Sequence, residues 1–464
     1  MNGSDRVRRP ELWLASIVVV ATLLRLYVFA AGPDLDTDAY GHAVLGRYTW
    51  DDPGNLQIHW VWLPLWHFVF AVLGWLGLGF QAVRRIDIAL SALVPVLVFA
   101  TVRRARPERG SADAVALRAA AFAALFPLAI THGQSAEPEA LFCVLLLTAA
   151  WCIERGARFL ASVALSVAVL LRFEAWAVLP AFAVASVWLV PDRGWPQRLV
   201  RGAVAVVLPG LTIALYVLLH RAAYDGRWLV FLSENHAFVR EARSHAVPGL
   251  GPQPVWTWYV ASLPFRTAGP VVLLALLGAW RFFRLAPKTY RLVGPWLLAF
   301  VTFGWVREQH LGLDRHFFAV VPFYALAMAE GAMLLTETVR RRWSAPWAST
   351  LVTAVPVLAL LGFSVHHAQA HARASAVAFE AERAMAALVV AQAPEAGSVY
   401  CAVGKVEVLS GLAPDRFAGS ETVRARAEAG RGVVVVDEVG HRDRWPQTWR
   451  SVGSSAEILV LAGP

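Results

Sequence analysis

Charged residues are scarce in this chain. Asp, Glu, Lys and Arg make up 16% of its 464 residues, whereas a soluble protein carries roughly 25%. Hydrophobic residues make up 58%, and the mean hydropathy is +0.52. Several apolar segments reach about 18 residues with almost no charge, which is the length needed to cross a bilayer core. The composition therefore predicts a polytopic membrane protein.

Cysteine is also scarce, with three residues in the whole chain. Cys143 and Cys152 lie in one apolar segment and Cys401 lies near the C-terminus. There is no CxxC pair and no Cys/His spacing of the kind that holds structural zinc. A structural zinc site is therefore not expected.

Several catalytic and transport signatures are missing. The chain has no GxxxxGK[ST] phosphate loop, no GxSxG elbow, no HExxH helix and no inverted repeat of the transporter kind. The formal net charge is +9, with arginine far ahead of lysine. These arginines punctuate apolar runs instead of forming a basic soluble face, so we expect topology signals and no nucleic-acid partner.

The first apolar run, 11–31, resembles a signal peptide because Arg6, Arg8 and Arg9 precede it. It is too long for one and no small-residue cleavage site follows, so we interpret it as a span. The predicted spans are 11–31, 86–102, 114–131, 138–153, 158–171, 174–190, 199–220, 267–284, 290–306, 316–336 and 347–366.

One further apolar stretch, residues 60–80, is ambiguous. If it crosses the membrane, the arginine-rich loop at 103–109 faces outward and every later loop inverts. If it lies in the plane of the interface, the arginine-rich loops gather on the inner side, as the positive-inside rule requires. Its four Trp, one His and three Gly also suit an interfacial helix. We therefore predict about eleven transmembrane helices, with in-plane helices in the first outer loop.

The predicted fold is an all-α membrane domain, residues 1–366, followed by a small α/β domain, residues 367–464, on the non-cytoplasmic side. In the second part hydrophobicity falls. FEAERAMAALVVAQ is typical of a helix, whereas 399–403, 433–438 and 457–463 are typical of buried strands. Its simplest role is a structural cap or an element that positions an acceptor.

The outer segments hold most of the unusual polar residues. The first is GPDLDTDAYGH, with Asp34, Asp36 and Asp38 after the first span. One aspartate could cap a helix that begins near AYGHAVLGRY. A carboxylate here could equally act as a general base or as a ligand of a divalent cation. Both readings stay open.

Two more acidic motifs lie at span entrances. In EPEALF, Glu137 and Glu139 flank a proline where the fourth span begins. Carboxylates at such places are costly unless they are used or paired, although a helix N-terminus favours one of them. In RFEAW, Arg172 and Glu174 interrupt an apolar run at a tight corner. They form either a local ion pair or a site in which the arginine grips a phosphate.

A short outer loop, REQHLGLDRHFF at 307–318, carries Arg307, Glu308, His310, Asp314, Arg315 and His316. Its two readings are anion binding and ordinary loop solvation. The longer loop 222–265 ends in WTWY, and aromatic residues near an interface are typical of the aromatic belt. We interpret it as a loop that shapes a substrate site.

The order of these motifs resembles the GT-C superfamily, integral membrane glycosyltransferases that use polyprenyl-phosphate sugars on the outer face of the membrane. The resemblance covers residues 11–340. It runs through DLDTDAY, the in-plane WLPLWHF, EPEALF, RFEAW and DRHFFAVVPFYALAMAEG. DAYGH and EPE are similar to the first and second acidic motifs of oligosaccharyltransferase catalytic subunits. Protein mannosyltransferases and lipid A aminoarabinose transferase belong to the same group.

The resemblance implies an inverting glycosyltransferase, in the plasma (bacterial inner) membrane, that moves a hexose or pentose in the manner of the mannosyltransferases. A polyprenyl-phosphate-linked donor, membrane lipids and a lipid, glycan or protein acceptor would be its partners. Asp38, or else Asp36, would be the catalytic base. Asp38, Glu137 and Glu139 could hold a divalent cation such as Mg or Mn. The expected substrate-binding residues are Glu137, Glu139, Arg172, Glu174, His42, His59, Arg307, His310, Arg315 and His316.

The sequence also departs from these relatives. It has no WWDYG-like acceptor motif and no large soluble domain, which weighs against transfer of a whole glycan to Asn. It lacks the common Asp-Glu pair of protein mannosyltransferases, which weighs against protein acceptors. Two other classes stay open: a transporter or flippase of a lipid-linked or anionic substrate, and a non-catalytic scaffold whose tail binds a partner.

Overall fold

The computed structural model describes most of the chain, and all statements below concern the described residues. Residues 245–256, within the loop predicted to shape a substrate site, lie outside them. The described ranges are 9–106, 109–189, 194–244, 257–307, 310–343, 346–392, 399–402, 404–412, 416–417, 420–429, 431–438, 445–446, 448–454 and 458–463.

Helices dominate the described residues, and six helical runs are long and apolar enough to cross a membrane. A bent pair, Ala112–Ala124 with Pro127–Gln134, makes a seventh if it counts as one span. A multi-pass membrane protein is thereby confirmed, whereas the number eleven stays a prediction. The six runs are α1 (Pro10–Ala31), α4 (Phe80–Ala105), α10 (Trp195–Ala223), Trp258–Leu285, Asp314–Arg342 and Thr350–Val377.

Each of the other predicted spans is also helical, but shorter or more polar. Further helices connect them, and one of these, α11, lies inside the long outer loop. The bounds are α5 (Arg109–Ala124), α6 (Pro127–Thr131), α7 (Glu139–Glu154), α8 (Arg158–Ala168), α9 (Phe173–Trp188), α11 (Val230–Ser244), α12 (Leu263–Ala268), α13 (Leu273–Leu285), α14 (Lys288–Val306), α15 (Val321–Arg342) and α16 (Pro346–Val377).

The ambiguous stretch 60–80 contains one helix, α3 (Leu65–Trp75), of 11 residues. At 1.5 Å per residue it is about 16 Å long, roughly half of the hydrocarbon thickness. Helix α3 is therefore too short to cross the membrane alone. Its length favours the in-plane reading of this stretch.

The chain divides into two compact units. The first comprises residues 1–30, 55–65 and 84–372, and the second comprises 31–54, 66–83 and 373–464. The boundary near residue 372 lies close to the predicted one at 366. The second unit, however, also takes in most of the segment between α1 and α4, including α2 (Thr37–Asp51) and α3.

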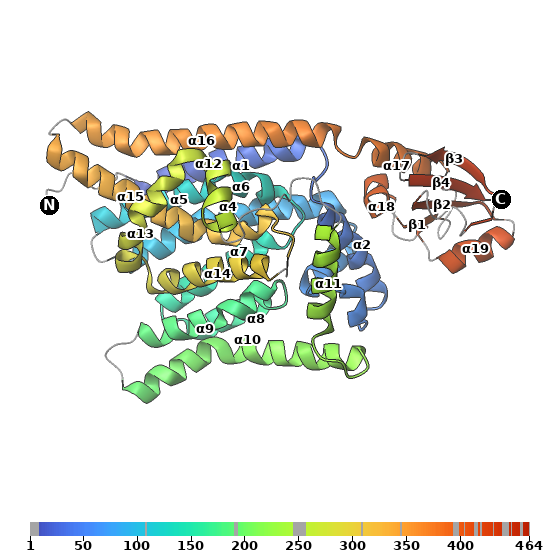
Figure 1. Cartoon of the computed structure of the whole chain (residues 1–464), viewed down its shortest axis with the longest axis horizontal. Coiled ribbons are helices and arrows are strands. Elements are labelled where there is room, and N and C mark those ends of the chain that lie inside the picture. Colours follow the sequence, from blue (N-terminus) through green and yellow to red (C-terminus); the bar gives the residue numbers. More distant parts are fainter. Residues whose placement is uncertain are drawn as a thin grey trace. The chain divides into compact units, whose positions relative to one another are not determined.

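In the first unit, small residues let two long helices approach closely. A Cβ added at Gly331 of α15 would overlap the carbonyl oxygen of Leu274 in α13, and one at Gly278 would overlap that of Ala327. Helices α8, α9 and α10 pack together nearby, and α14 packs on α9 (Figure 1). The fully buried Glu330 accepts from Arg106 and from Arg281, which ties α13 to α15. Apolar packing and this buried ion pair hold the helices together.

In the second unit, four strands form a sheet in the order β1-β2-β4-β3. The three predicted strands are confirmed as β1 (Val399–Cys401), β2 (Val433–Glu438) and β4 (Ile458–Gly463). Strand β1 runs parallel to β2, and β4 runs antiparallel to both β2 and the edge strand β3 (Arg450–Ser454). Val434 aligns with Val399 and Ala462, which sets the register.

Both faces of this sheet are covered. Alternate residues of β2 point to opposite faces, so Val434 and Val436 pack against α17 (Glu380–Gln392), which confirms the predicted helix. Val433 and Val435 pack with Trp445 and with α19 (Ser420–Glu428) on the other face. Figure 1 shows these two helices beside the sheet. The apolar run VVVV is thus explained by burial on both sides.

Candidate active site

The EPE motif lies at the N-terminus of α7. Pro138 precedes the helix and Glu139 begins it, so the missing N–H of proline costs no helical hydrogen bond. The helix dipole stabilises a carboxylate in this first turn. Glu137 and Glu139 are nevertheless almost completely buried, with 3% and 2% of their surfaces exposed. Buried carboxylates need cationic or hydrogen-bonding partners.

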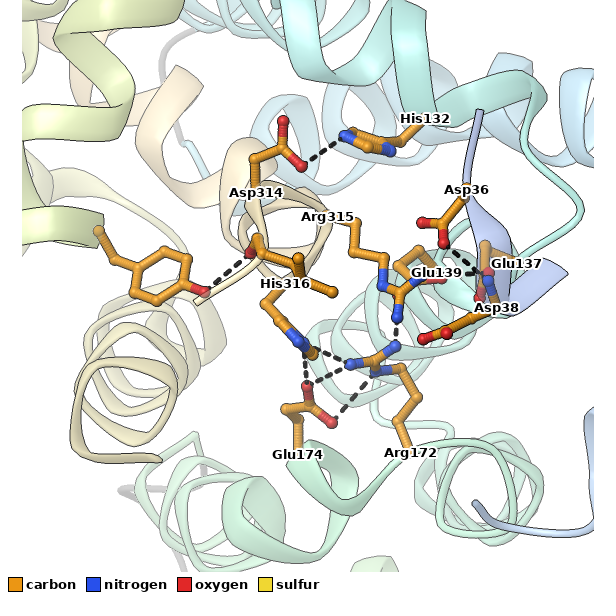
Figure 2. Close-up of polar contacts among 12 residues, drawn as sticks. Asp36, Asp38, His132, Glu137, Glu139, Arg172, Glu174, Asp314, Arg315 and His316 are labelled. Carbon is orange, nitrogen blue, oxygen red and sulfur yellow. Dashed lines mark hydrogen bonds and ion pairs between the residues drawn. The ribbon is translucent and has the colours of Figure 1, made fainter. Parts of the chain in front are cut away.

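Arg172, at the corner between α8 and α9, supplies part of that charge. Its Nε and Nη2 donate to the two oxygens of Glu174 at 3.1 and 2.7 Å, and its Nη1 donates to Oε1 of Glu139 (Figure 2). Burial lowers the pKa of Arg172, but the two carboxylates outweigh it and hold the pKa above its usual value. The local ion pair is therefore present, and Arg172 also reaches a carboxylate 33 residues away.

Arg315 supplies the second guanidinium group. It lies in the 3₁₀ turn Asp314–Val320, and its Nη1 donates to Oε1 of Glu137 at 3.1 Å. Its Nε lies 3.7 Å from Oε1 of Glu139. The neighbouring Asp314 pairs with Nε2 of His132 at 3.1 Å (Figure 2). Arg315 thus joins its loop to both glutamates of the EPE motif, and Asp314 joins the same loop to His132.

The loop before Arg315 is itself held by hydrogen bonds. The Tyr259 hydroxyl donates to the carbonyl of Leu313 at 2.8 Å, and the Trp258 indole donates to the carbonyl of Gly312 at 2.8 Å. Gly312 has φ +77°, and a Cβ there would overlap the ring of Trp305. Only glycine fits this close left-handed position without strain. The turn thereby fixes the position of the backbone from which the Arg315 side chain extends.

The two histidines of this loop have assignable tautomers. His310 donates from Nε2 to the carbonyl of Val301 at 2.8 Å and accepts from the backbone N–H of Gly312 at Nδ1. Burial, and then the nearby His316, hold its pKa well below the usual range, so His310 is neutral. His316 must accept at Nδ1 from Arg172, because a guanidinium group has only donors. Neither histidine is placed to act as a general base through Nδ1.

The charges of the cluster can be counted. The carboxylates of Glu137, Glu139 and Glu174 lie beside the guanidinium groups of Arg172 and Arg315, and Asp314 adds a fourth carboxylate next to His132, so carboxylates outnumber guanidinium groups. Such a balance suits neutral hydroxyl groups better than a phosphate. The predicted phosphate role of both arginines stays a prediction, and this balance counts against it.

The three aspartates of the opening motif belong to the second unit, and each has a different place. Asp34 is buried; its Oδ1 accepts from the N–H of Asp36 at 3.1 Å, and its carbonyl accepts from the Tyr40 hydroxyl. Asp36 is the N-cap of α2, and its Oδ1 accepts from the N–H of Asp38 at 3.1 Å. Asp38 lies in the first turn of the helix, where the dipole favours negative charge.

The remaining predicted residues do not all join the cluster. His42 of α2 is buried in the second unit, with its Nδ1 at 2.8 Å from Nε2 of His67 in α3. His59 is buried in the first unit, and burial lowers its pKa to about 4. Arg307 is exposed at the end of α14. The sequence reasoning missed His67 and the His132–Asp314 pair, and no local pattern indicates either partner.

The predicted divalent cation does not fit the two glutamates as they stand. Both carboxylates face guanidinium groups, and a cation there would have to displace Arg172 or Arg315. Asp38, the third predicted ligand, belongs to the other unit. Among the described residues, no group of three or more His, Cys, Asp or Glu side chains could hold a metal ion.

Comparison with protein-family models and with curated proteins finds no match. Solved structures do match. ArnT from Cupriavidus metallidurans, bound to undecaprenyl phosphate, aligns with TM-score 0.63 and 14% identity over 97% of this chain and 98% of its own. The chain therefore shares the fold of ArnT. That fold, predicted from the order of the motifs, is confirmed.

Two structures from Archaeoglobus fulgidus extend the likeness. The oligosaccharyltransferase AglB, in complex with an inhibitory peptide and a dolichol-phosphate, aligns with TM-score 0.52 and 11% identity over 93% of this chain and 70% of its own. An oligosaccharyltransferase structure in complex with Zn and sulfate aligns with TM-score 0.51 and 11% identity over 92% of this chain and 68% of its own. The alignment with ArnT covers almost the whole length of both chains, whereas about 30% of each oligosaccharyltransferase chain lies outside its alignment.

Proposed function

We propose that this protein is an inverting membrane glycosyltransferase that takes one sugar from a polyprenyl-phosphate donor at the non-cytoplasmic face. The observation that carries the proposal is the whole-length likeness to ArnT, whose structure is described as bound to undecaprenyl phosphate. The acceptor is a hydroxyl group of a lipid, glycan or protein. The membrane in question is the plasma, or bacterial inner, membrane.

The geometry of α2 favours Asp38 over Asp36 as the base. Asp36 already caps the helix through Oδ1, and a cap satisfies a backbone N–H that would otherwise be left without a partner. Asp38 follows in the first turn of α2, where it is not the cap, and its side chain is half-buried. We assign the cap to Asp36 and the proton transfer to Asp38.

The reaction is a direct displacement. Asp38 accepts the proton of the acceptor hydroxyl, whose oxygen forms a bond to the anomeric carbon. The bond from that carbon to the phosphate oxygen breaks, and the polyprenyl phosphate leaves with the electron pair. Attack opposite the leaving group inverts the anomeric carbon. One base is sufficient, because no covalent sugar–enzyme intermediate forms.

The glutamate–arginine cluster serves the donor sugar in this scheme. Arg172 and Arg315 contact Glu139 and Glu137, and carboxylate oxygens held in this way can also accept hydrogen bonds from hydroxyl groups. The excess of carboxylates over guanidinium groups disfavours binding of the phosphate in this cluster. We therefore assign Glu137, Glu139 and Glu174 to orienting the sugar hydroxyls.

The test uses the purified protein in lipid nanodiscs with a panel of polyprenyl-phosphate sugars. Released polyprenyl phosphate is measured for the wild type and for Asp38→Asn, Asp36→Asn and the control Asp51→Asn, an exposed acid at the end of the same helix. Asn is a good N-cap, so Asp36→Asn keeps the cap while removing the charge.

We expect Asp38→Asn to lower turnover by at least about 100-fold, the usual contribution of a general base. Asp36→Asn and Asp51→Asn should stay close to wild type. Full activity of Asp38→Asn would overturn the assignment, and loss of activity in Asp36→Asn alone would move the base to Asp36. No release from any donor in the panel would count against the proposed function itself.

A further inference from the structure

The role of the C-terminal part is left open by the proposed reaction. The composition of the second unit suggests such a role, because this unit contains both the sheet and the loop that bears Asp36 and Asp38. These segments are more than 330 residues apart in the sequence. Four kinds of contact connect them.

The first contact is at the start of the loop. Ser375, near the end of α16, is buried and donates from Oγ to the carbonyl of Pro33. A Cβ added at Gly32 would lie 2.7 Å from the carbonyl oxygen of Ser375, which is too close without movement. The backbone of the aspartate loop is thus pressed directly against residue 375, and only glycine permits it.

The second and third contacts involve the first turns of α2. The Tyr40 ring meets Phe379 edge-on, with 5.6 Å between centroids. Gly404, at the start of α18 (Gly404–Ser410), lies against Val44 and the carbonyl of Tyr40, so that an added Cβ would be 3.3 Å from Val44 Cγ2. Both contacts lie within two turns of Asp38.

The fourth contact is an ion pair one turn further on. Nη1 of Arg47 lies 2.7 Å from Oε1 of Glu407 in α18, and the two side chains are 16% and 8% exposed. The guanidinium group also lies over the Phe417 ring, at 5.1 Å from its centroid. A nearly buried ion pair of this kind has defined geometry and is costly to break.

We propose that the C-terminal domain is a positioning element, which holds the helix bearing Asp38 through the Ser375–Pro33 bond and the Arg47–Glu407 ion pair. The inference rests on the proposed function for the importance of Asp38. The claim that these contacts hold α2 in place does not rest on the proposed function, because it concerns the order of α2 alone. Arg47, Glu407 and Ser375 are positioning residues that act through α2.

The test measures hydrogen exchange of the full-length protein in nanodiscs at pH 8. Arg47→Met removes the charge of one partner, Gly32→Ala pushes the loop from Ser375, and Gly74→Ala is the matched control. Gly74 lies in α3 of the same unit, and an added Cβ there meets no atom within 4 Å. The peptide 37–51 reports on α2, and the peptide 139–154 of α7 reports on general stability.

We expect Arg47→Met and Gly32→Ala to raise the exchange rate of peptide 37–51 by about tenfold or more, with Gly74→Ala and the α7 peptide unchanged. The reversed pair Arg47→Glu with Glu407→Arg should restore protection. Unchanged exchange of 37–51 in both variants would overturn the proposal, as would a failure of the reversed pair to restore it.

A second measurement uses the donor that supports wild-type turnover. A misplaced base should lower kcat by about tenfold or more while KM for the donor stays close to wild type. A rise in KM alone would overturn the positioning role. Because hydrogen exchange needs no substrate, a failure of the proposed function leaves the first measurement intact.

Discussion

Arg172 is the residue on which the first-unit cluster depends. It holds two carboxylates from different helices, and all three side chains are at most 13% exposed. Arg172→Met keeps the apolar stem but leaves Glu139 and Glu174 without this cation. Removing one member of a buried ion pair costs about 3–5 kcal/mol, because the remaining charge stays buried. We expect a loss of this size in thermal unfolding followed by tryptophan fluorescence.

The matched control is Arg104→Met, an exposed arginine in the last turn of α4. Surface substitutions usually change stability by about 0.5 kcal/mol or less. Arg172→Lys should fall between the two variants, because one ammonium group cannot make the two-pronged contact with Glu174. Equal losses for Arg172→Met and Arg104→Met would contradict the structural role of the cluster.

Glu407 should give the second unit a distinctive pH dependence. Burial raises the pKa of its carboxyl from 4.5 to about 7, and Arg47 offsets part of the rise. Between these two values the folded state holds a proton that the unfolded state has lost. Stability is therefore greatest below pH 4.5, falls as the pH rises to about 7 and is constant above that. The loss is roughly 1.4 kcal/mol for each unit of pKa difference.

The measurement is hydrogen exchange of strand β2, corrected for the chemical exchange rate at each pH. We expect its protection to decrease between pH 5 and 7 in the wild type and to stay flat in Glu407→Gln. The same slope in both proteins would show that another group causes it.

At the scale of elements, the contact between α13 and α15 leaves no room for an added methyl group at its glycines. Gly278 and Gly331 each lie against the backbone of the other helix, so an added methyl group forces the helices apart. Close backbone approach through small residues is a main source of helix association in membranes. Gly331→Ala should therefore lower the melting temperature in detergent, although alanine has the higher helix propensity.

Gly362→Ala in α16 is the control, because a Cβ there meets no atom within 4 Å. It should leave the melting temperature unchanged or raise it slightly. An unchanged or higher melting temperature for Gly331→Ala would show that the helices have room for the methyl group. That result would contradict the close backbone contact between α13 and α15.

The elements themselves were largely predictable. Apolar runs and turn residues placed a helix at every predicted span and three of the four strands, because burial of an apolar side chain leaves a periodic mark in the sequence. Strand β3 was missed, since RSVGS is a polar edge strand with a register shift between Ser451 and Gly453. Helix α11 was also missed inside a loop.

The contacts of the site were less predictable. The acidic motifs indicated a common face, and Glu137, Glu139, Arg172, Glu174 and Arg315 do lie together. Which arginine meets which glutamate depends on tertiary packing across up to 178 residues, and no local spacing records it. The pairing of the first outer loop with the C-terminal domain had no sequence signal either. The convergence of Asp38 with the glutamates stays a prediction.

At the scale of the whole molecule, the open question is which segments face outward. With the stretch 60–80 in the plane of the membrane, the predicted eleven spans put the N-terminus inside and the C-terminal domain outside. If that stretch crosses, every later segment inverts. The 11 residues of α3 favour the first arrangement.

Single cysteines decide between the two arrangements. In a background without Cys143, Cys152 and Cys401, we place one cysteine at Glu380 or at Arg104, both exposed in the structure. A membrane-impermeant maleimide is then added to vesicles of known orientation. The in-plane arrangement predicts labelling of Glu380→Cys from the non-cytoplasmic side and of Arg104→Cys from the cytoplasmic side. The crossing arrangement predicts the reverse for both, because every segment after the stretch inverts. The helix of Asp38, which precedes the stretch, would then lie on the opposite side of the membrane from the EPE motif and from the C-terminal domain.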